Sequence, residues 1–117
     1  DGGTRTASIT GGFIALNFCI KILKEKKIIN TNPIKNYLAA ISCGIVKGDV
    51  LVDLDYDEDS NADIDANFVI NDVNQIVELQ MTGEQATCSE KQLNEMLNLA
   101  KQSIQLLIKK QKNILSA

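Results

Sequence analysis

The chain of 117 residues contains no histidine, no tryptophan and a single proline. Without histidine, these residues cannot form a Ser-His-Asp triad, a Cys-His pair or a histidine-based zinc site, and they lack the most common general base. Any chemistry in the chain must therefore use carboxylates, lysine or arginine, hydroxyl groups, backbone amides or a hard metal ion.

Cysteine is also scarce, and the spacing of Cys19, Cys43 and Cys88 matches neither a zinc site nor a Cys-x-x-Cys redox pair. The expected compartment is the reducing cytosol. Cys19 and Cys43 lie in apolar segments, where a free cysteine usually packs as a small hydrophobic residue. No catalytic or metal-binding role is expected for these thiols.

Positive charge is limited, because the net charge is -3 and the isoelectric point is near 4.8. This excludes binding of nucleic acid by bulk positive charge and leaves only local contacts. No apolar run approaches the ~20 residues of a membrane span, and the N-terminus lacks the pattern of a signal peptide. We expect one soluble, cytoplasmic domain over residues 1–117, either a fragment or a processed half of a longer protein.

Hydrophobic periodicity predicts the order of the elements. A wide apolar pattern from Thr6 to about Lys24 predicts a central, largely buried helix. Ser89-Glu-Lys-Gln92 is a capping-box pattern that opens an amphipathic helix with an apolar stripe from Leu93 to Ile108. Between the helices, four strand-like runs at hairpin spacing favour an antiparallel meander: Tyr37–Val46, Val50–Tyr56, Ala66–Asn71 and Gln75–Met81. The predicted class is α+β, with the order helix, four antiparallel strands, helix.

The opening stretch Asp1–Thr6 carries the only arginine of the chain, Arg5, directly before the first predicted helix. Its two glycines allow the backbone to approach a ligand, and the residues after them occupy a helical turn with unpaired N–H groups and positive dipole. Gly3, Thr4, Arg5 and Thr6 are therefore candidates for binding phosphate or sulfate. The alternative is an ordinary N-terminal cap by Thr4 or Thr6 with a solvated Arg5.

Seven of the fifteen acidic residues lie between Asp53 and Asp65. Like charges this close repel one another unless a positive ligand binds them. If the preceding strand continues, Asp53, Asp55 and Asp57 share one face, and Asp59 lies past its end. An EF-hand is excluded, because the twelve-position loop lacks its central Gly and final Glu. Magnesium fits better, since it needs only one or two carboxylates; the alternative is a solvated acidic loop.

With both segments in view, the whole chain closely resembles the C-terminal half of the ribonuclease PH family of phosphorolytic 3′ exoribonucleases. Five blocks carry the resemblance: Asp1–Thr10, Thr31–Ile34, Leu38–Ile45, Asp53–Ser60 and Val77–Gly83. Polynucleotide phosphorylase and the exosome ring proteins share the architecture, but Thr31–Ile34 and Leu54–Asp59 look more like ribonuclease PH. One departure is Met81, which stands where the family usually has glycine.

The resemblance implies a ribosomal-protein-S5-domain-2-like fold and phosphate-dependent trimming of tRNA 3′ ends with release of nucleoside diphosphates, the activity of a tRNA nucleotidyltransferase. By analogy, Thr4 and Arg5, with Gly3 and Thr6, hold inorganic phosphate. Asp53 and Asp59 are implied as catalytic carboxylates and as ligands of Mg²⁺. They coincide with residues that the charge pattern singles out.

The resemblance also implies a hexameric ring, a trimer of dimers, acting on RNA. The family's N-terminal half, with the arginines that guide RNA, lies outside this sequence. We therefore expect association with a companion polypeptide that carries that half, or self-association. The alternative is an inactive fragment or a non-catalytic structural subunit of a ring.

Overall fold

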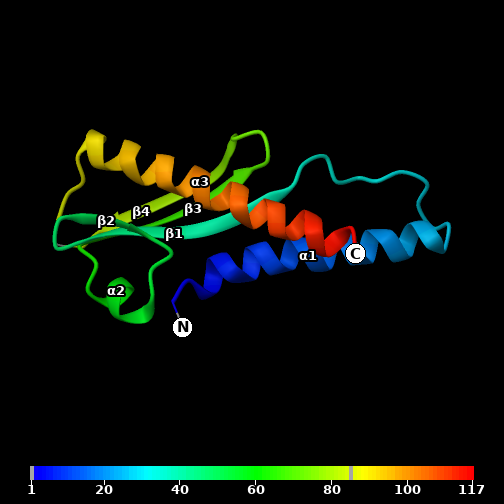
Figure 1. Ribbon diagram of the computed structural model, residues 1–117, viewed down its shortest axis with the longest axis horizontal. Helices are drawn as coiled ribbons and strands as arrows, with labels where there is room; N and C mark the ends of the chain where they lie inside the picture. The colour runs from blue at the N-terminus through cyan, green and yellow to red at the C-terminus, as the bar shows by residue number, and fades with distance from the viewer. Residues whose placement is uncertain (1, 85) are drawn as a thin grey trace.

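The computed structural model describes residues 2–84 and 86–117. The elements in chain order are α1 (Thr4–Glu25), β1 (Leu38–Val46), β2 (Asp49–Val52), α2 (Tyr56–Ser60), β3 (Ile64–Asn71), β4 (Ile76–Gly83) and α3 (Glu90–Leu115). The predicted order of helix, four antiparallel strands and helix is confirmed, with the short α2 as an addition. Figure 1 shows α1 and α3 on opposite sides of the sheet.

The strands form one antiparallel sheet in the order β2-β1-β3-β4. The predicted meander is wrong, because β3 pairs with β1 and not with β2. The second strand also ends at Val52 rather than at Tyr56, since Asp53 takes a left-handed φ of 60° and Asp55 opens α2. These turns carry the chain away from the β2 edge, so that β3 returns on the other side of β1 (Figure 1).

The face of the sheet under α3 holds the hydrophobic core. α3 begins with the predicted capping box: the Gln92 amide donates to Ser89 Oγ over 3.1 Å, and the Ser89 amide donates to Gln92 Oε1 over 3.0 Å. Its apolar stripe then packs against alternate residues of β1 and β3. The core side chains are all at most 7% exposed: Ala39, Ile41, Cys43, Ile45, Ile64, Ala66, Phe68, Ile70, Met96, Ala100, Ile104 and Ile108.

Two polar side chains tie the helices to the start of β1, where β3 pairs with one edge and the other edge is open, since β2 pairs only with the residues from Cys43 onward. Thr10 Oγ1 of α1 accepts a hydrogen bond from the Ala40 amide over 3.0 Å. Gln111 of α3, 1% exposed, donates through Nε2 to the carbonyl oxygens of Thr10 and Leu38. These bonds satisfy backbone groups at an open strand edge, where buried unpaired groups are costly.

α1 is far less buried than the sequence predicts. Within it only Thr6 and Phe13 are buried, and the Phe13 ring packs against Tyr37 with centroids 5.4 Å apart. Leu16 and Ile22 are both 49% exposed. The prediction of a largely buried helix is therefore wrong for this chain as it stands.

α1 is also the one helix in the described parts of the chain that is long and apolar enough to cross a membrane. Its 18-residue window has a mean hydropathy of 1.5, and 11% of that window is buried. The expectation of no such segment is wrong by this measure, because scattered Gly, Ser and Thr interrupt the apolar run without adding charge. One such helix near the N-terminus is weak evidence for a membrane span, since core helices and leader sequences have the same properties.

All three cysteines are free. Cys43 packs in the core as predicted, and burial, followed by the negative charge of Asp53, raises the pKa of its thiol to about 12. It is therefore protonated and inert at neutral pH. Cys19 is exposed, contrary to the prediction, because its side of α1 has no neighbouring element in the described chain.

Candidate functional site

The start of α1 is open to a ligand. The N-cap is Gly3, whose φ of 64° is left-handed, and the helix begins at Thr4. Among the described residues no side chain caps the first amides, and the first turn contains no acidic residue. Thr6 Oγ1 donates to the Gly3 carbonyl oxygen over 2.9 Å instead of accepting from an amide. Capping by Thr4 or Thr6 is therefore wrong, and the positive end of the helix remains available to an anion.

Gly2 brings the two candidate segments together. A side chain at position 2 would collide with the carbonyl oxygen of Leu54 and with the backbone of Asp55. Leu54 is itself fixed, because its side chain is 2% exposed and its amide donates to Ser42 Oγ over 3.2 Å. The glycine thus lets the N-terminal segment pass directly against the start of the acidic segment.

The acidic segment is a helix rather than the end of a strand. Asp55 is the N-cap of α2, and its Oδ1 accepts from the Glu58 amide over 2.8 Å. Glu58 Oε2 in turn accepts from the Asp55 amide over 3.0 Å. Asp53, Asp55 and Asp57 therefore do not share a strand face, and that prediction is wrong. Acidic residues are favoured in this first helical turn by its dipole.

A cavity of about 240 Å³ lies between the start of α1, α2 and the sheet. It unites Thr4 and Arg5 with Asp59, as the candidate assignments require. It also includes two residues of β3 that had no assigned role: Asp65, the last residue of the acidic segment, and Asn67. The residues that line it are Gly2, Gly3, Thr4, Arg5, Ser42, Tyr56, Asp59, Asp65 and Asn67.

Two carboxylates, Asp59 and Asp65, also border an adjoining cavity of about 440 Å³ that contains Asp63 and Glu84. Partial burial of its carboxyl group, followed by the negative charge of Asp59, raises the pKa of Asp65 above its ordinary value, although the residue as a whole is exposed. This coupling indicates that the two carboxylates lie close enough to repel each other. A cation between them would relieve that repulsion.

The carboxylates of this cavity can supply only part of the ligands that Mg²⁺ needs. Within residues 2–84 and 86–117, no group of three or more His, Cys, Asp or Glu residues is arranged to hold a metal ion. Two carboxylates are nevertheless sufficient where water and phosphate oxygens supply the other ligands. Asp59 and Asp65 are the pair that meets this condition beside Arg5.

Arg5 is oriented by a residue of the far edge strand. Its Nη2 donates to Glu78 Oε1 of β4 over 2.6 Å, with the two side chains 50% and 40% exposed. The register pairs Glu78 with Val69, two residues from Asn67. A guanidinium has five N–H donors, so that this ion pair leaves others free for a phosphate in the cavity.

Asp53 and Thr6 lie apart from this cavity. Both line a neighbouring space of about 240 Å³ with Ala40 and Leu107, on the side of the N-terminal segment that faces α3. One signal in the sequence could have pointed to Asp65 as a further candidate: Asp65 and Asn67 alternate with core residues of a strand. Met81 pairs with the core residue Ala66 and so lies on the opposite face from Asp65.

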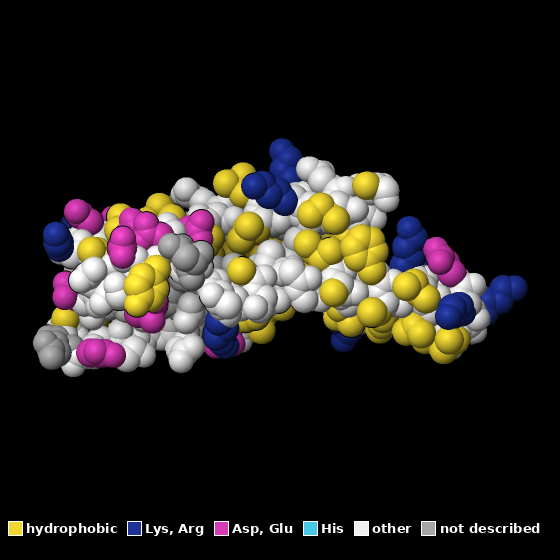
Figure 2. Space-filling model, turned by 90° about the horizontal axis from the view of Figure 1, so that it is seen from below, with side chains coloured by type: hydrophobic (Ala, Val, Ile, Leu, Met, Phe, Trp, Pro, Cys, Tyr) yellow, Lys and Arg dark blue, Asp and Glu magenta, His cyan; other side chains and the backbone are white. Residues whose placement is uncertain are grey.

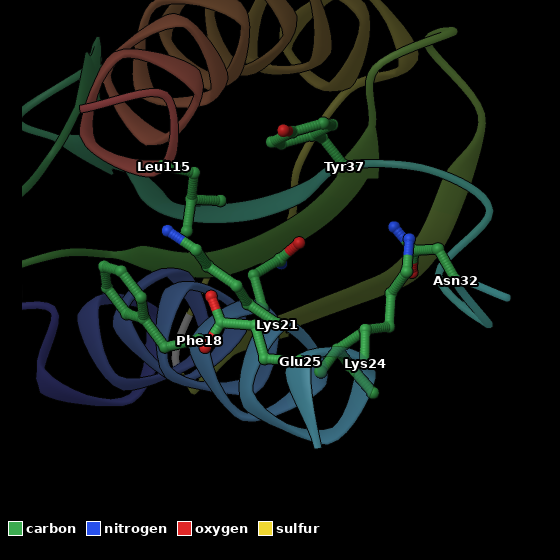
Figure 3. A pocket seen from close by; sticks show the side chains of 9 residues that line it. Phe18, Lys21, Lys24, Glu25, Asn32, Tyr37 and Leu115 are labelled. Carbon is green, nitrogen blue, oxygen red and sulfur yellow. The ribbon is translucent and has the colours of Figure 1, made fainter. Parts of the chain in front are cut away.

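A separate cavity of about 390 Å³ lies at the other end of α1 (Figure 3). Phe18 and Lys21 border it from α1, Tyr37 from the segment before β1, and Leu115 from the end of α3. It contains none of the candidate phosphate-binding or acidic residues.

Comparison with known proteins identifies the family. A family model described as the 3′ exoribonuclease family, domain 2, matches residues 36–103. Ribonuclease PH of Bacillus pumilus (strain SAFR-032) is 51% identical over 115 residues, which are 97% of this chain and 48% of the relative. Ribonuclease PH of Bacillus subtilis (strain 168) is 53% identical over 116 residues, which are 98% of this chain and 47% of the relative. The chain thus spans about half the length of the curated relatives it matches.

Solved structures support the fold. An archaeal exosome core superimposes with a TM-score of 0.60 and 24% identity over 68% of this chain and 32% of that one. The Archaeoglobus fulgidus exosome with RNA bound to the active site gives a TM-score of 0.59 and 21% identity over 74% of this chain and 35% of that one. Because the family model covers more than half of its residues, the chain belongs to the 3′ exoribonuclease family, as a C-terminal domain of the ribonuclease PH type.

Proposed function

We propose that this chain supplies the phosphate-binding and carboxylate side of a phosphorolytic 3′ to 5′ exoribonuclease. The observation that carries the proposal is the single cavity that contains Arg5 at an uncapped helix start together with Asp59 and Asp65. A cation and an anion site that share one cavity suit a reaction in which phosphate attacks a phosphodiester. Family membership supports the same reaction class.

Inorganic phosphate binds at the start of α1. The amides of Thr4, Arg5 and Thr6 and the Arg5 guanidinium together offer charge-assisted hydrogen bonds to its oxygens. The guanidinium donates one hydrogen bond to Glu78 beside this cavity and has further N–H donors for the phosphate oxygens. Arg5 thereby neutralises the nucleophile and orients it toward the RNA 3′ end.

Asp59 and Asp65 form the carboxylate pair. We assign the second carboxylate to Asp65 rather than to Asp53, because Asp65 shares the cavity with Asp59 and Arg5. Mg²⁺ held by this pair would stabilise negative charge that develops on the transferred phosphoryl group. One of the two groups, as the protonated carboxylic acid, would donate its proton to the 3′ oxygen of the shortened RNA as that oxygen leaves, while the other stays ionised and would hold Mg²⁺; the terminal nucleotide then departs with the attacking phosphate as a nucleoside diphosphate.

The proposed substrate is an RNA 3′ end, with tRNA as the implied class. The subunit would act in the cytoplasm as part of a hexameric ring. This chain spans about half of its relatives, and the remaining half of the subunit supplies the grip on RNA. Alone, the chain should therefore release little or no nucleoside diphosphate. The competing function is an inactive fragment or a structural ring subunit, and the presence of Arg5, Asp59 and Asp65 in one cavity disfavours the structural subunit.

Two measurements test the proposal. In the chain alone, a phosphate titration followed by NMR should shift the amide signals of Thr4 to Thr6, and Arg5→Ala should abolish these shifts. In a covalent chimera that joins the N-terminal half of B. subtilis ribonuclease PH to this chain, Arg5→Ala should raise the KM for phosphate on the order of a hundredfold and leave the KM for RNA nearly unchanged.

Lys24→Ala is the matched control, because Lys24 is a cation on the same helix at the opposite end. It should change neither the NMR shifts nor the KM for phosphate. A chimera that folds but degrades a tRNA-like 3′ tail without phosphate, or not at all, would contradict the proposed reaction.

A further inference from the structure

Close packing does not hold the first two turns of α1 in place. A space of about 240 Å³ separates them from β1 and α3, and it is bordered by Thr10 on the helix side and by Ala40 and Leu107 opposite. Within α1 only Thr6 and Phe13 are buried. Apolar contacts have no preferred direction, and here they are also few. Packing by itself therefore does not fix the position of α1 along its axis.

Hydrogen bonds, which are directional, connect α1 to the sheet at Thr10. Thr10 Oγ1 accepts from the Ala40 amide over 3.0 Å and donates to the Ala40 carbonyl oxygen over 3.3 Å. Gln111 Nε2 of α3 donates to the carbonyl oxygens of Thr10 over 3.0 Å and of Leu38 over 2.8 Å. One hydroxyl and one amide thus join α1, β1 and α3. We call these four hydrogen bonds the Thr10–Gln111 lock.

Gln111 is an unusual choice for a position so deeply buried. The residue is 1% exposed, and its Oε1 is the one buried side-chain nitrogen or oxygen in residues 2–84 and 86–117 without a hydrogen-bond partner. A buried oxygen that is left unpaired lowers stability, and an apolar side chain of similar shape avoids that cost. The two bonds that Nε2 donates, rather than the packing of the core, therefore account for an amide at this position.

The lock lies close to the candidate phosphate site. Thr10 follows Thr4 by six residues in the same helix, which corresponds to about 9 Å along the helix axis. A shift of α1 at Thr10 therefore moves the amides of Thr4 and Arg5 with it. Figure 2, seen from the side of α1, shows acidic side chains gathered at the end of the molecule that carries α2. The distance from Arg5 to these charges also depends on where α1 lies.

The segment before α1 has a second fixed point. Gly2 passes so close to Leu54 and Asp55 that a Cβ at position 2 would collide with their backbone. The candidate phosphate-binding residues, 3–6, lie between this point and the lock. With both ends held, their amides keep a constant position relative to Asp59 and Asp65 across the cavity.

We propose that Thr10 and Gln111 are positioning residues for the phosphate site. They do not touch phosphate, but they hold the start of α1 where its amides and Arg5 face the carboxylate pair. This inference rests on the proposed function and names what aligns the two sides of its site. A misplacement of about 1 Å can cost on the order of a hundredfold where catalysis depends on orientation. Loss of the lock should therefore weaken the use of phosphate before it unfolds the chain.

The test measures the phosphate affinity of the chain alone, from the amide signals of Thr4 to Thr6 in an NMR titration. Thr10→Val removes the hydroxyl but keeps the shape of the side chain, and Gln111→Met removes the amide but keeps its length. Each should weaken phosphate binding about tenfold. The double variant should be weaker by less than the product of the two single effects, because both changes break the same lock.

Two controls separate positioning from stability. Thr10→Ser keeps the hydroxyl and should restore the affinity that Thr10→Val loses. Phe13→Leu removes buried apolar contacts of the same helix, so it should lower stability in urea and leave phosphate affinity unchanged. In the covalent chimera, Gln111→Met should raise the KM for phosphate about tenfold and leave the KM for RNA unchanged.

Three results would overturn the inference. If the unchanged chain binds phosphate and the folded Thr10→Val and Gln111→Met variants bind it equally well, the lock has no positioning role, while the proposed function stands. If Phe13→Leu weakens binding as much as they do, the effect is a general loosening of α1. If the unchanged chain binds no phosphate, the proposed function fails and this inference fails with it. Should Gln111→Met not fold, the comparison of Thr10→Val with Thr10→Ser decides alone.

Discussion

Against one face of the sheet, α3 buries Met96, Ala100 and Ile104 completely, whereas on the other side α1 buries only Thr6 and Phe13 of its 22 residues. The α3 face is a closed hydrophobic core that accounts for the stability of the domain. On the other face, the sheet presents polar side chains toward α1, and Asp65 and Asn67 line a cavity there. The side of α1 that faces solvent is apolar. The comparison indicates that the closed core and the candidate site lie on opposite faces of the sheet, and that the face with the candidate site is the less covered one.

The largest expected effect tests whether Asp59 and Asp65 are the carboxylates that phosphorolysis requires. In the covalent chimera, Asp59→Asn and Asp65→Asn should each lower phosphorolysis on the order of 10²–10³-fold, because each removes a charge from the Arg5 cavity. Asp53→Asn is the matched control and should retain activity, since Asp53 lies outside that cavity and asparagine tolerates its left-handed φ. Near-normal turnover of the Asp65 variant, or loss of activity in the Asp53 variant, would restore the assignment implied by the resemblance.

The second-largest expected effect tests the difference in packing between α3 and α1. Ile104→Ala in the α3 core should lower the free energy of unfolding by about 2–5 kcal/mol, because the side chain is fully buried. Ile22→Ala on the solvent-facing side of α1 should change it by about 0.5 kcal/mol or less, since half of that side chain already contacts solvent. Urea unfolding of the chain measures both. A large loss for Ile22→Ala would mean that the solvent-facing side of α1 is already covered, for example by another copy.

The smallest effect is the pH dependence of stability due to Asp65. A raised pKa in the folded chain means that folding disfavours the charged carboxylate, so ionised Asp65 lowers stability above that pKa. The lost stability returns as the pH falls through the raised pKa toward the ordinary value of 3.8. Asp65→Asn should therefore stabilise the chain slightly at neutral pH and have no effect near pH 3.

Urea unfolding across this pH range checks the prediction. Asp49→Asn, at the turn between β1 and β2, serves as the control for removing a carboxylate from an acidic chain. An equal gain in stability from both substitutions would mean that general charge repulsion, rather than the partial burial of Asp65 and its proximity to Asp59, is responsible.

Local patterns in the sequence predicted the elements well where the controlling interactions are themselves local. The capping box at Ser89 and the stripe that ends at Ile108 are both confirmed, because they depend on residues within a few positions of one another along one helix. The prediction that the second strand extends to Tyr56 was wrong, and the cause is again a local interaction. Asp55 and Glu58 form a second capping box, a signal present in the sequence that competes with strand continuation.

The candidate site was only half accessible to sequence reasoning. Arg5 stands out by its charge and its position after two glycines, and Asp59 stands out by its place in the acidic segment; the cavity contains both. Asp65 was not distinguished from the other carboxylates of the acidic segment, and Glu78 did not stand out, because it is an ordinary charged residue in a strand. Their relation to Arg5 depends on a pairing of distant segments.

The sequence by itself determined the order of the two long helices and the four strands, the start of α3 and the family, since each follows from short-range periodicity or from blocks of matching residues. Only the tertiary structure decided that β3 pairs with β1, that Asp65 joins Arg5 and Asp59, and that the solvent-facing side of α1 is left uncovered. The physical reason is that strand pairing and burial depend on which surfaces far apart in the chain exclude water together. An apolar pattern shows that a surface needs cover, but not whether the same polypeptide provides it.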